Sequence, residues 1–478
     1  MLFNSFTFLL FFAIVVALYS LPVAWTHRKL VLLIASYLFY AAWNPPFVAL
    51  LWLSTVVDWF AARLMERSER RGVRRGLLGV SLLVNLGLLG LFKYGNFACE
   101  AFVDAAALVG LHFVPPELDL ILPVGISFYT FQTLSYSIDV YRRVAKPCNS
   151  FLDFALYVTF FPQLVAGPIV RATDFLPQAR LPQRANLGQF VWGVNLLLLG
   201  IFQKAVVADG LLAPTTERIY AAEVISTAGA WLGTLAFAGQ IFCDFAGYST
   251  AAIGVALCLG FRLPDNFRFP YAAIGFSDFW RRWHISLSAW LRDYLYIPLG
   301  GNRRGPLRTH ANLMLTMLLG GLWHGAAWTF VLWGAMHGLL LILERWLRTT
   351  AVGRCSLWRT RFGRFTLAAL TFAAVCVTWT VFRAHSFTQA ASLVVAMFGL
   401  PSVSELETPA VLPGAWETLV VVSVMATLLT LHGLLRNTTL EAAVSKLPWA
   451  AVAIVNAAMI YLLATMPGED RAFIYFQF

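Results

Sequence analysis

The feature that most constrains this chain is the length of its apolar runs. Leu313–Leu343 is a run of 31 residues without lysine, arginine, aspartate or glutamate. As one straight helix it would measure about 46 Å at about 1.5 Å per residue, whereas the hydrocarbon core of a bilayer is about 30 Å thick. Because the apolar runs are continuous and do not alternate with polar residues, they favour membrane-spanning helices over a transmembrane β-barrel.

Composition supports the same fold class. The 478 residues are 59% hydrophobic and 12% charged, against about 45–50% and about 25% in soluble domains. So few charges cannot cover a water-soluble particle of this size, which excludes a soluble multidomain enzyme. We therefore predict an all-α polytopic membrane protein that forms a single domain over 1–478. The expected spans lie at about 6–25, 30–43, 47–62, 77–93, 121–141, 189–212, 228–260, 309–345, 365–383, 413–434 and 447–466.

The segments 151–166 and 94–120 differ from the membrane-spanning runs. The run 151–166 is short and is bounded by Pro162 and by Gly167-Pro168. It predicts a re-entrant element, which is tolerated at membrane depth only when it is buried in protein. The segment 94–120 carries acidic residues and no lysine or arginine, so we predict that it lies outside the cytoplasm.

The positions of the basic residues predict the topology. The net charge is +11, and six arginines fall within each of 63–75, 281–308 and 345–364. An excess of arginine and lysine marks cytoplasmic loops. Membrane topology and contact with membrane lipid therefore explain the net charge. A nucleic-acid partner is not predicted. An anionic substrate at the cytoplasmic face is the open alternative. The first apolar run precedes His27-Arg28-Lys29, which predicts a periplasmic N-terminus.

The segment Trp280–Tyr296 is the first candidate for a functional site. Its apolar and aromatic residues recur at helical spacing, and the pattern predicts one amphipathic helix in the membrane interface. His284 falls on the tryptophan side of this helix, away from the arginines. It is either a packed histidine held by a hydrogen bond or a functional histidine directed into the protein.

His324 is the stronger candidate, because it lies near the middle of the uncharged run 313–343. Gly320-Gly321 and Gly325 surround it, and there we expect the chain to bend or break. An ionisable side chain at membrane depth is costly and is functional by default. A histidine suits general-base catalysis near neutral pH. The spacing of the histidines does not indicate a metal site, and we expect His337 to be structural. The remaining histidines, at positions 27, 112, 310, 385 and 432, lie in or near expected loops and receive no role.

At these residues the sequence resembles a known family, the membrane-bound O-acyltransferases, and within it the branch of bacterial alginate O-acetylases. The resemblance extends over essentially the whole chain. The stretches that carry it are LPVGISFYTFQTLSYSIDVYRR (122–143), FFPQLVAGPIVRA (160–172), FCDFAGYSTAAIGVALCLGFRLPDNFRFPY (242–271), DFWRRWHISLSAWLRDYLYIPLGGNRRG (278–305), GGLWHGAAWTFVLWGAMHG (320–338) and FIYFQF (473–478).

The resemblance implies a fold, a reaction and partners. The fold would be a ring of tilted helices around a thin centre, in the bacterial inner membrane. A cytoplasmic thioester, most simply acetyl-CoA, would donate an acetyl group to a hydroxyl on the periplasmic side. A periplasmic acetyltransferase of the SGNH type, or the polysaccharide itself, would receive it, for an exopolysaccharide of the alginate or cellulose type. A bound cofactor is not expected.

The resemblance also implies roles for single residues. His324 matches the principal catalytic histidine of the family, and His284 matches its second polar position. Further residues of the same motifs are predicted to bind substrate, among them arginines that could meet the phosphates of coenzyme A: Trp283, Trp323, Arg281, Arg282, Asp293, Tyr294, Arg303 and Arg304.

Two alternative functions remain open. One is D-alanyl transfer to teichoic acid, which another branch of the family performs with a carrier-protein donor. The other is a proton-coupled transporter or flippase with His324 in a proton relay. Such transporters usually show internal repeats and several carboxylates in the membrane, for which Asp58, Asp139 and Asp244 are the candidates here.

Overall fold

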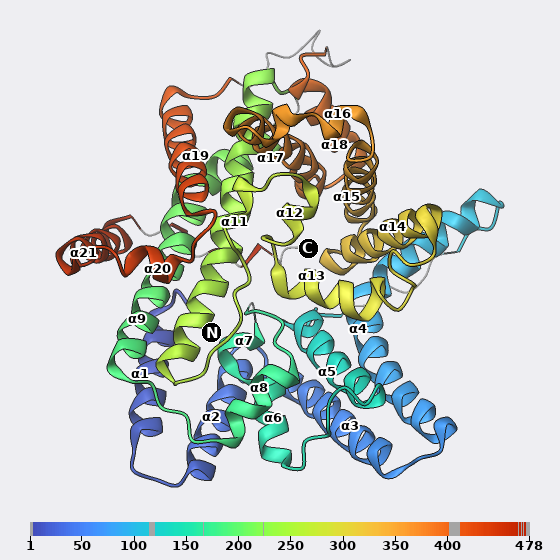
Figure 1. Cartoon of the computed structure of the whole chain (residues 1–478), viewed down its shortest axis with the longest axis vertical. Coiled ribbons are helices and arrows are strands. Elements are labelled where there is room, and N and C mark those ends of the chain that lie inside the picture. The colour runs from blue at the N-terminus through green and yellow to red at the C-terminus, as the bar shows by residue number, and fades with distance from the viewer. Residues whose placement is uncertain are drawn as a thin grey trace. The chain divides into compact units, whose positions relative to one another are not determined.

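The computed structural model describes residues 3–113, 120–165, 167–222, 224–400, 412–466, 468–469, 471 and 473–474. Within these residues the chain forms helices joined by loops (Figure 1), and the prediction of an all-α protein is confirmed. The chain divides into two compact units. Unit 1 comprises Met1–Leu197 and Ser249–Pro264, and unit 2 comprises Leu198–Tyr248 and Asp265–Phe478.

Helices α9 and α11 contribute residues to both units. The helices that begin in unit 1 are α1 (Phe6–Ser20), α2 (Trp25–Ala41), η1 (Pro45–Phe47), α3 (Val48–Arg67), α4 (Arg71–Leu108), α5 (Ile126–Tyr141), α6 (Phe151–Thr159), α7 (Phe161–Leu164), α8 (Ala172–Arg180) and α9 (Leu187–Phe202). Those that begin in unit 2 are η2 (Gln203–Leu212), α10 (Ala213–Tyr220), α11 (Thr227–Cys258), η3 (Pro270–Ala272), α12 (Phe276–Trp280), α13 (Ile285–Leu291), η4 (Arg292–Tyr296), α14 (Gly305–His324), α15 (Trp328–Leu347), α16 (Ala351–Arg354), η5 (Ser356–Arg359), α17 (Arg361–Arg383), α18 (Phe387–Met397), α19 (Ala415–Leu435), α20 (Leu440–Val444) and α21 (Trp449–Thr465).

Seven helical segments in the described part of the chain are long and apolar enough to cross a membrane, which makes this a multi-pass membrane protein. They are Pro45–Arg67, Arg71–Leu108, Leu187–Tyr220, Thr227–Cys258, Trp328–Leu347, Arg361–Arg383 and Ala415–Leu435. The terminal helices α1 and α21 have 15 and 17 residues. Both are shorter than the spans predicted at 6–25 and 447–466.

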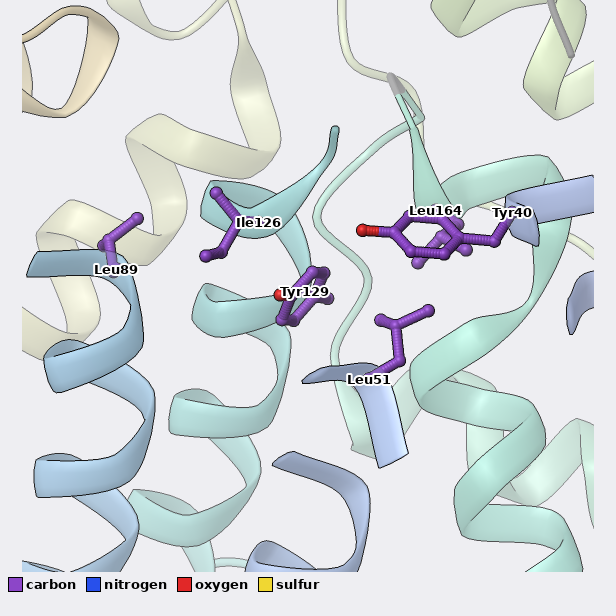
Figure 2. Close-up of a cluster of buried hydrophobic side chains, with 6 residues drawn as sticks. All are labelled: Tyr40, Leu51, Leu89, Ile126, Tyr129 and Leu164. Atoms are coloured by element: carbon purple, nitrogen blue, oxygen red, sulfur yellow. The ribbon is translucent and has the colours of Figure 1, made fainter. Parts of the chain in front are cut away.

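Helices α3, α4 and α5 pack against one another in unit 1 (Figure 1). Side chains of these three helices form a buried cluster with side chains of α2 and α7, and Figure 2 draws six of its members, Tyr40, Leu51, Leu89, Ile126, Tyr129 and Leu164. The buried carboxylate of Asp58 joins the three helices. It accepts hydrogen bonds from Ser81, from Asn85 (2.8 Å) and from Ser137 (2.9 Å). A buried carboxylate paired in this way serves packing.

The run 151–166 and the segment 94–120 both belong to unit 1. The run 151–166 is interrupted as predicted, because α6 ends at Thr159 and the short α7 starts at Phe161, and both helices are buried. Within 94–120, whose position outside the cytoplasm stays a prediction, α4 continues as a helix beyond the predicted end of the span at 93 to Leu108. The acidic residues Glu100 and Asp104 interrupt the apolar sequence of this helix but do not end the helix itself. Both lie near its exposed end, where a charged side chain reaches water.

In unit 2, the uncharged run is divided between α14 and α15, and the predicted break is confirmed. Helix α14 ends at His324, and Gly325 follows in an extended conformation (φ −154°, ψ 149°). A Cβ atom at Gly325 would overlap the ring of Phe330. Gly321 and Gly334 face each other, where a Cβ on either would overlap the opposite helix. These glycines let the two backbones approach closely, as small residues do in membrane helix pairs.

Candidate active site

His324 lies at the last helical position of α14, where the break at Gly325 turns the chain toward α15. Its side chain is 1% exposed. Aromatic rings enclose it, with centroid separations of 5.1 Å to Trp323, 5.0 Å to Trp333 and 5.7 Å to Phe382. The sequence therefore places an ionisable ring in an enclosure of low polarity, where electrostatic interactions with a reacting group are strong.

The second histidine is presented by a turn that the sequence did not predict. Instead of one amphipathic helix over Trp280–Tyr296, α12 ends at Trp280, α13 starts at Ile285, and η4 is a π-helix. His284 stands between them in the left-handed region, with φ 43°. Its side chain is fully buried, and the prediction of a continuous interfacial helix is wrong.

The reason for the break is visible in the partners of this turn. The backbone N–H of Ile285 donates to the carbonyl of Asn266 (2.9 Å), and the backbone N–H of Arg268 donates to the carbonyl of Arg282 (2.9 Å). These two bonds tie the turn to the segment after α11. They replace helical hydrogen bonds, and such long-range partners are not visible in a local periodicity.

Asn266 determines which ring nitrogen of His284 carries the hydrogen. The Asn266 Oδ1 atom accepts from the backbone N–H of Ser286 (3.3 Å) and from its hydroxyl (2.9 Å), which identifies it as the carbonyl oxygen. Since Nδ1 of His284 lies 3.2 Å from the same oxygen, Nδ1 donates and Nε2 keeps the lone pair. Burial lowers the pKa of His284 to about 3, so the ring is neutral at physiological pH.

The two histidines lie close to each other inside unit 2. Their ring centroids are 6.3 Å apart, with an angle of 65° between the planes. The ring of Trp323 contacts both, at 5.7 Å from His284 and 5.1 Å from His324. Residues that are 40 positions apart in the sequence thus lie next to each other in one buried aromatic region.

The indole N–H groups of Trp283, Trp333 and Trp379 are among those in this aromatic region that lack a hydrogen-bond partner in the described part of the chain. All three side chains are fully buried, and Trp379 contacts both Trp283 (4.9 Å between centroids) and Trp333 (5.8 Å). Buried polar groups are normally paired. These donors are therefore suited to bind an oxygen atom of a molecule that enters the site.

Two further buried histidines have structural partners. His337 packs on Trp333, and its Nε2 lies 3.0 Å from the hydroxyl of Thr378, in agreement with its predicted structural role. His432 was expected in or near a loop. It is instead buried within α19, and its Nδ1 accepts from the backbone N–H of Tyr271 (3.3 Å).

The predicted substrate-binding residues occupy different environments. Trp323 is buried against both histidine rings, and Trp283 is buried in the same aromatic region against Phe267 and Trp379. Arg281, Arg303 and Arg304 are exposed. Asp293 pairs with Arg292 (2.7 Å), and the ring of Tyr294 lies 5.1 Å from that of Trp290.

Arg282 is engaged in a network centred on Asp278. Its Nε donates to Asp278 Oδ1 (3.1 Å), and Arg436 donates to Oδ2 (2.6 Å). Burial raises the pKa of Asp278, but hydrogen bonds from the Ile274 N–H and from the two guanidinium groups outweigh it and hold that pKa below its usual range. The network connects α12 with the end of α19, and so fixes the helix that precedes His284.

A buried charged cluster adjoins the site, and sequence reasoning missed it. Lys204 contacts Asp209 (2.9 Å) and Asp244, and all three residues are buried. Lys204 and Asp209 are five positions apart, a spacing that shares a face only because η2 is a π-helix. The two charges inside the predicted span 189–212 were the signal that could have revealed it.

The cluster also holds the C-terminal segment. Asp244 accepts a hydrogen bond from the backbone N–H of Ile474 (2.8 Å). Next to it, the buried ring of Phe473 lies 5.4 Å from Phe245, whose ring is 4.7 Å from His284. A chain of contacts therefore runs from the buried ions to the second histidine. Among the described residues, three or more His, Cys, Asp or Glu side chains do not gather where they could hold a metal ion.

The sequence is similar to that of known proteins. Residues 142–383 match the model of the membrane-bound O-acyltransferase family. The chain is 43% identical to the probable alginate O-acetylase AlgI of Azotobacter vinelandii, over 83% of this chain and 78% of the relative. It is 37% identical to the peptidoglycan O-acetyltransferase of Helicobacter pylori, over 79% and 75%. It is 32% identical to the teichoic acid D-alanyltransferase of Streptococcus thermophilus, over 47% and 57%.

Proposed function

The chain belongs to the membrane-bound O-acyltransferase family, and we propose that it transfers acetyl groups from cytoplasmic acetyl-CoA to a hydroxyl on the periplasmic side of the bacterial inner membrane. The acceptor is an exopolysaccharide of the alginate or cellulose type, reached directly or through a periplasmic SGNH-type acetyltransferase. In this proposal the N-terminus is periplasmic. The observation that carries it is the pair of buried imidazoles of His284 and His324, 6.3 Å apart at the break after α14.

In the proposed reaction His324 acts as the general base. It takes the proton of the acceptor hydroxyl while the oxygen attacks the carbonyl carbon of the acetyl thioester. The carbonyl oxygen becomes negatively charged in the tetrahedral intermediate, and the unpartnered indole N–H groups are donors that could stabilise it. When the intermediate collapses, the C–S bond breaks, the thiolate of coenzyme A leaves with a proton, and an ester has formed.

His284 has a different proposed role, because its tautomer is fixed. The Nδ1–H of His284 donates to Asn266, so its Nε2 lone pair can accept a hydrogen bond or a proton next to His324. The arrangement matches a relay that carries the proton toward the leaving thiolate. Both imidazoles sit among aromatic rings, which would exclude water and favour attack by the hydroxyl over hydrolysis.

The phosphates of coenzyme A require cationic partners at the cytoplasmic end. Arg303 and Arg304 are exposed and could meet them in a charge-assisted contact. Arg281 is exposed as well, although its guanidinium also lies 3.9 Å from the carboxylate of Asp278. Arg282 is less suited to this role, because its donors already serve Asp278 and the backbone carbonyl of Arg436 (3.0 Å).

The relatives support acetyl transfer over the two alternatives. The identity to the alginate O-acetylase extends over most of the chain, whereas that to the D-alanyltransferase covers about half of it. The transporter alternative relied on carboxylates in the membrane. Asp58 is bonded to three side chains and Asp244 to Lys204 and Ile474, so both serve packing.

Reconstitution tests the proposal directly. Proteoliposomes that contain the purified protein receive acetyl-CoA labelled in the acetyl group on one side and an alginate oligosaccharide, with or without an SGNH-type acetyltransferase, on the other. We expect the label to appear in an alkali-labile ester on the acceptor. Label that crosses the membrane without forming an ester would support a transporter, and transfer only from a D-alanyl carrier protein would support the other branch.

A positioning role of Asn266 gives a further prediction. Asn266→Ala removes the acceptor for the Nδ1–H of His284, so the ring can adopt the other tautomer, and kcat should fall about 10-fold to 100-fold. The lost hydrogen bond should also lower stability by about 1–3 kcal/mol. Asn266→Asp keeps an acceptor oxygen and should restore part of kcat, with a changed pH profile because a carboxylate raises the pKa of His284. Equal kcat in Asn266→Ala and wild type would contradict the role.

A further inference from the structure

A cavity in unit 1 offers a binding site that the proposed acyl transfer does not use. Its volume is about 300 Å³, and its wall is formed by the end of α1, the start of α2, the residues before α9 and the end of α11. Two arginines, Arg28 and Arg184, line it together with Tyr19, Asn186, Leu187 and Phe190. Among the described residues that line it, neither aspartate nor glutamate occurs, so the cavity has a positive character.

The donors of the cavity are only partly used within the protein. The Nη2 atom of Arg28 donates to the carbonyl of Leu21 (3.0 Å), and its guanidinium lies 5.9 Å from the centre of the Tyr19 ring. Its Nε–H is buried and has no partner in the described part of the chain. Arg184 is exposed at the same wall. Helix α9 starts at Leu187, so the positive end of its dipole adds to this potential.

Apolar surface continues from the cavity along α9. On this helix Leu187, Val191 and Val194 are 80%, 50% and 43% exposed, and their spacing of four and three residues places them on one face. Leu187 also lines the cavity, so a cationic recess and a stripe for a hydrocarbon chain meet at one place.

We propose that this cavity binds the phosphate headgroup of an anionic phospholipid, with an acyl chain along the exposed face of α9. The arginines provide charge-assisted hydrogen bonds to the phosphate oxygens, and the apolar stripe on α9 selects an amphiphile over a free phosphate. The zwitterionic headgroup of phosphatidylcholine carries a quaternary amine that would lie against the two guanidinium groups. The site therefore prefers phosphatidylglycerol to phosphatidylcholine. This inference does not depend on the proposed function.

Binding is tested on the full-length protein, purified in detergent and depleted of lipid. Dioleoyl phosphatidylglycerol, dioleoyl phosphatidylcholine, inorganic phosphate and coenzyme A are titrated separately, and bound molecules are counted by native mass spectrometry. We expect phosphatidylglycerol to be retained most strongly. Comparable retention of phosphatidylcholine would overturn the proposal, and so would displacement of phosphatidylglycerol by coenzyme A, because the cavity would then belong to the donor.

Variants locate the binding at this cavity. Arg28→Gln/Arg184→Gln should weaken phosphatidylglycerol binding about 30-fold, since each arginine near an anionic lipid contributes roughly a factor of five. Arg184→Lys should retain most of the affinity, and Ala185→Phe should reduce it by filling the cavity without a change of charge. Arg262→Gln is the matched control, because Arg262 is exposed in the same unit but does not line the cavity. If Ala185→Phe and the double variant, both eluting as folded protein, bind phosphatidylglycerol as the wild type does, the proposal is wrong.

Discussion

Replacing His324 with alanine is expected to lower acetyl transfer by roughly 10²- to 10⁴-fold, the contribution that a positioned general base typically makes. The reason is local, because the imidazole sits at the end of α14 between the rings of Trp323, Trp333 and Phe382. The substitution removes the base and leaves a cavity in an otherwise rigid aromatic region. The measurement is the rate of ester formation in the proteoliposome assay, normalised to the amount of folded protein.

A matched control separates chemistry from packing. His337 is equally buried in the same aromatic region, but its Nε2 contacts the hydroxyl of Thr378. His337→Ala should lower the melting temperature about as much as His324→Ala, while a measurable rate of transfer remains. If His324→Ala transfers acetyl groups at nearly the wild-type rate, another group must act as the base. If both variants lose activity in proportion to their loss of folded protein, His324 is a packing residue.

The second large effect concerns the buried cluster of Lys204, Asp209 and Asp244. Lys204→Met leaves two buried carboxylates without a cation, and breaking a buried ion pair from one side costs about 3–5 kcal/mol. We expect a large drop in the melting temperature of the purified protein and a low yield of folded material. Because Asp244 also holds Ile474, the C-terminal segment should become accessible to carboxypeptidase before the protein unfolds.

Two further variants make this prediction specific. The triple variant Lys204→Met/Asp209→Asn/Asp244→Asn removes all three charges, and it should recover much of the lost stability, since neutral replacements of buried ion pairs are often tolerated. Arg143→Met breaks the exposed pair with Glu69, whose side chains are 61% and 83% exposed, and should change stability by less than about 1 kcal/mol. A stable Lys204→Met variant would mean that Asp209 and Asp244 are protonated and do not need the lysine.

Hydropathy and composition were sufficient for the fold class. The helices α3, α11, α17 and α19 begin and end within a few residues of the predicted spans, except that α3 continues five residues further, to Arg67. The break at Gly325 was also predictable, because 31 uncharged residues exceed the thickness of a bilayer and glycine is the residue that tolerates a change of direction. The membrane-spanning helices and this break depend on short segments of sequence and on the lipid around them.

Periodicity was misleading where partners distant in the sequence determine the backbone. Trp280–Tyr296 has helical spacing, yet the chain leaves the helix at His284, because Asn266 and its neighbours supply other hydrogen-bond partners. The same holds for the pairing of Lys204 with Asp209, which requires a π-helix, and for the buried position of His432. Each depends on a tertiary contact that local sequence patterns do not contain.

The sequence by itself determined that this is a helical membrane protein with a histidine at a break in an uncharged run, because the free energy of burying apolar and charged groups depends on the side chains alone. Only the tertiary structure decided that His284 is the neighbour of His324, which tautomer it carries, and which indole donors remain available. These relations join α14 to the turn before α13, to the segment after α11, and to α15 and α17. Their geometry results from the packing of many side chains at once.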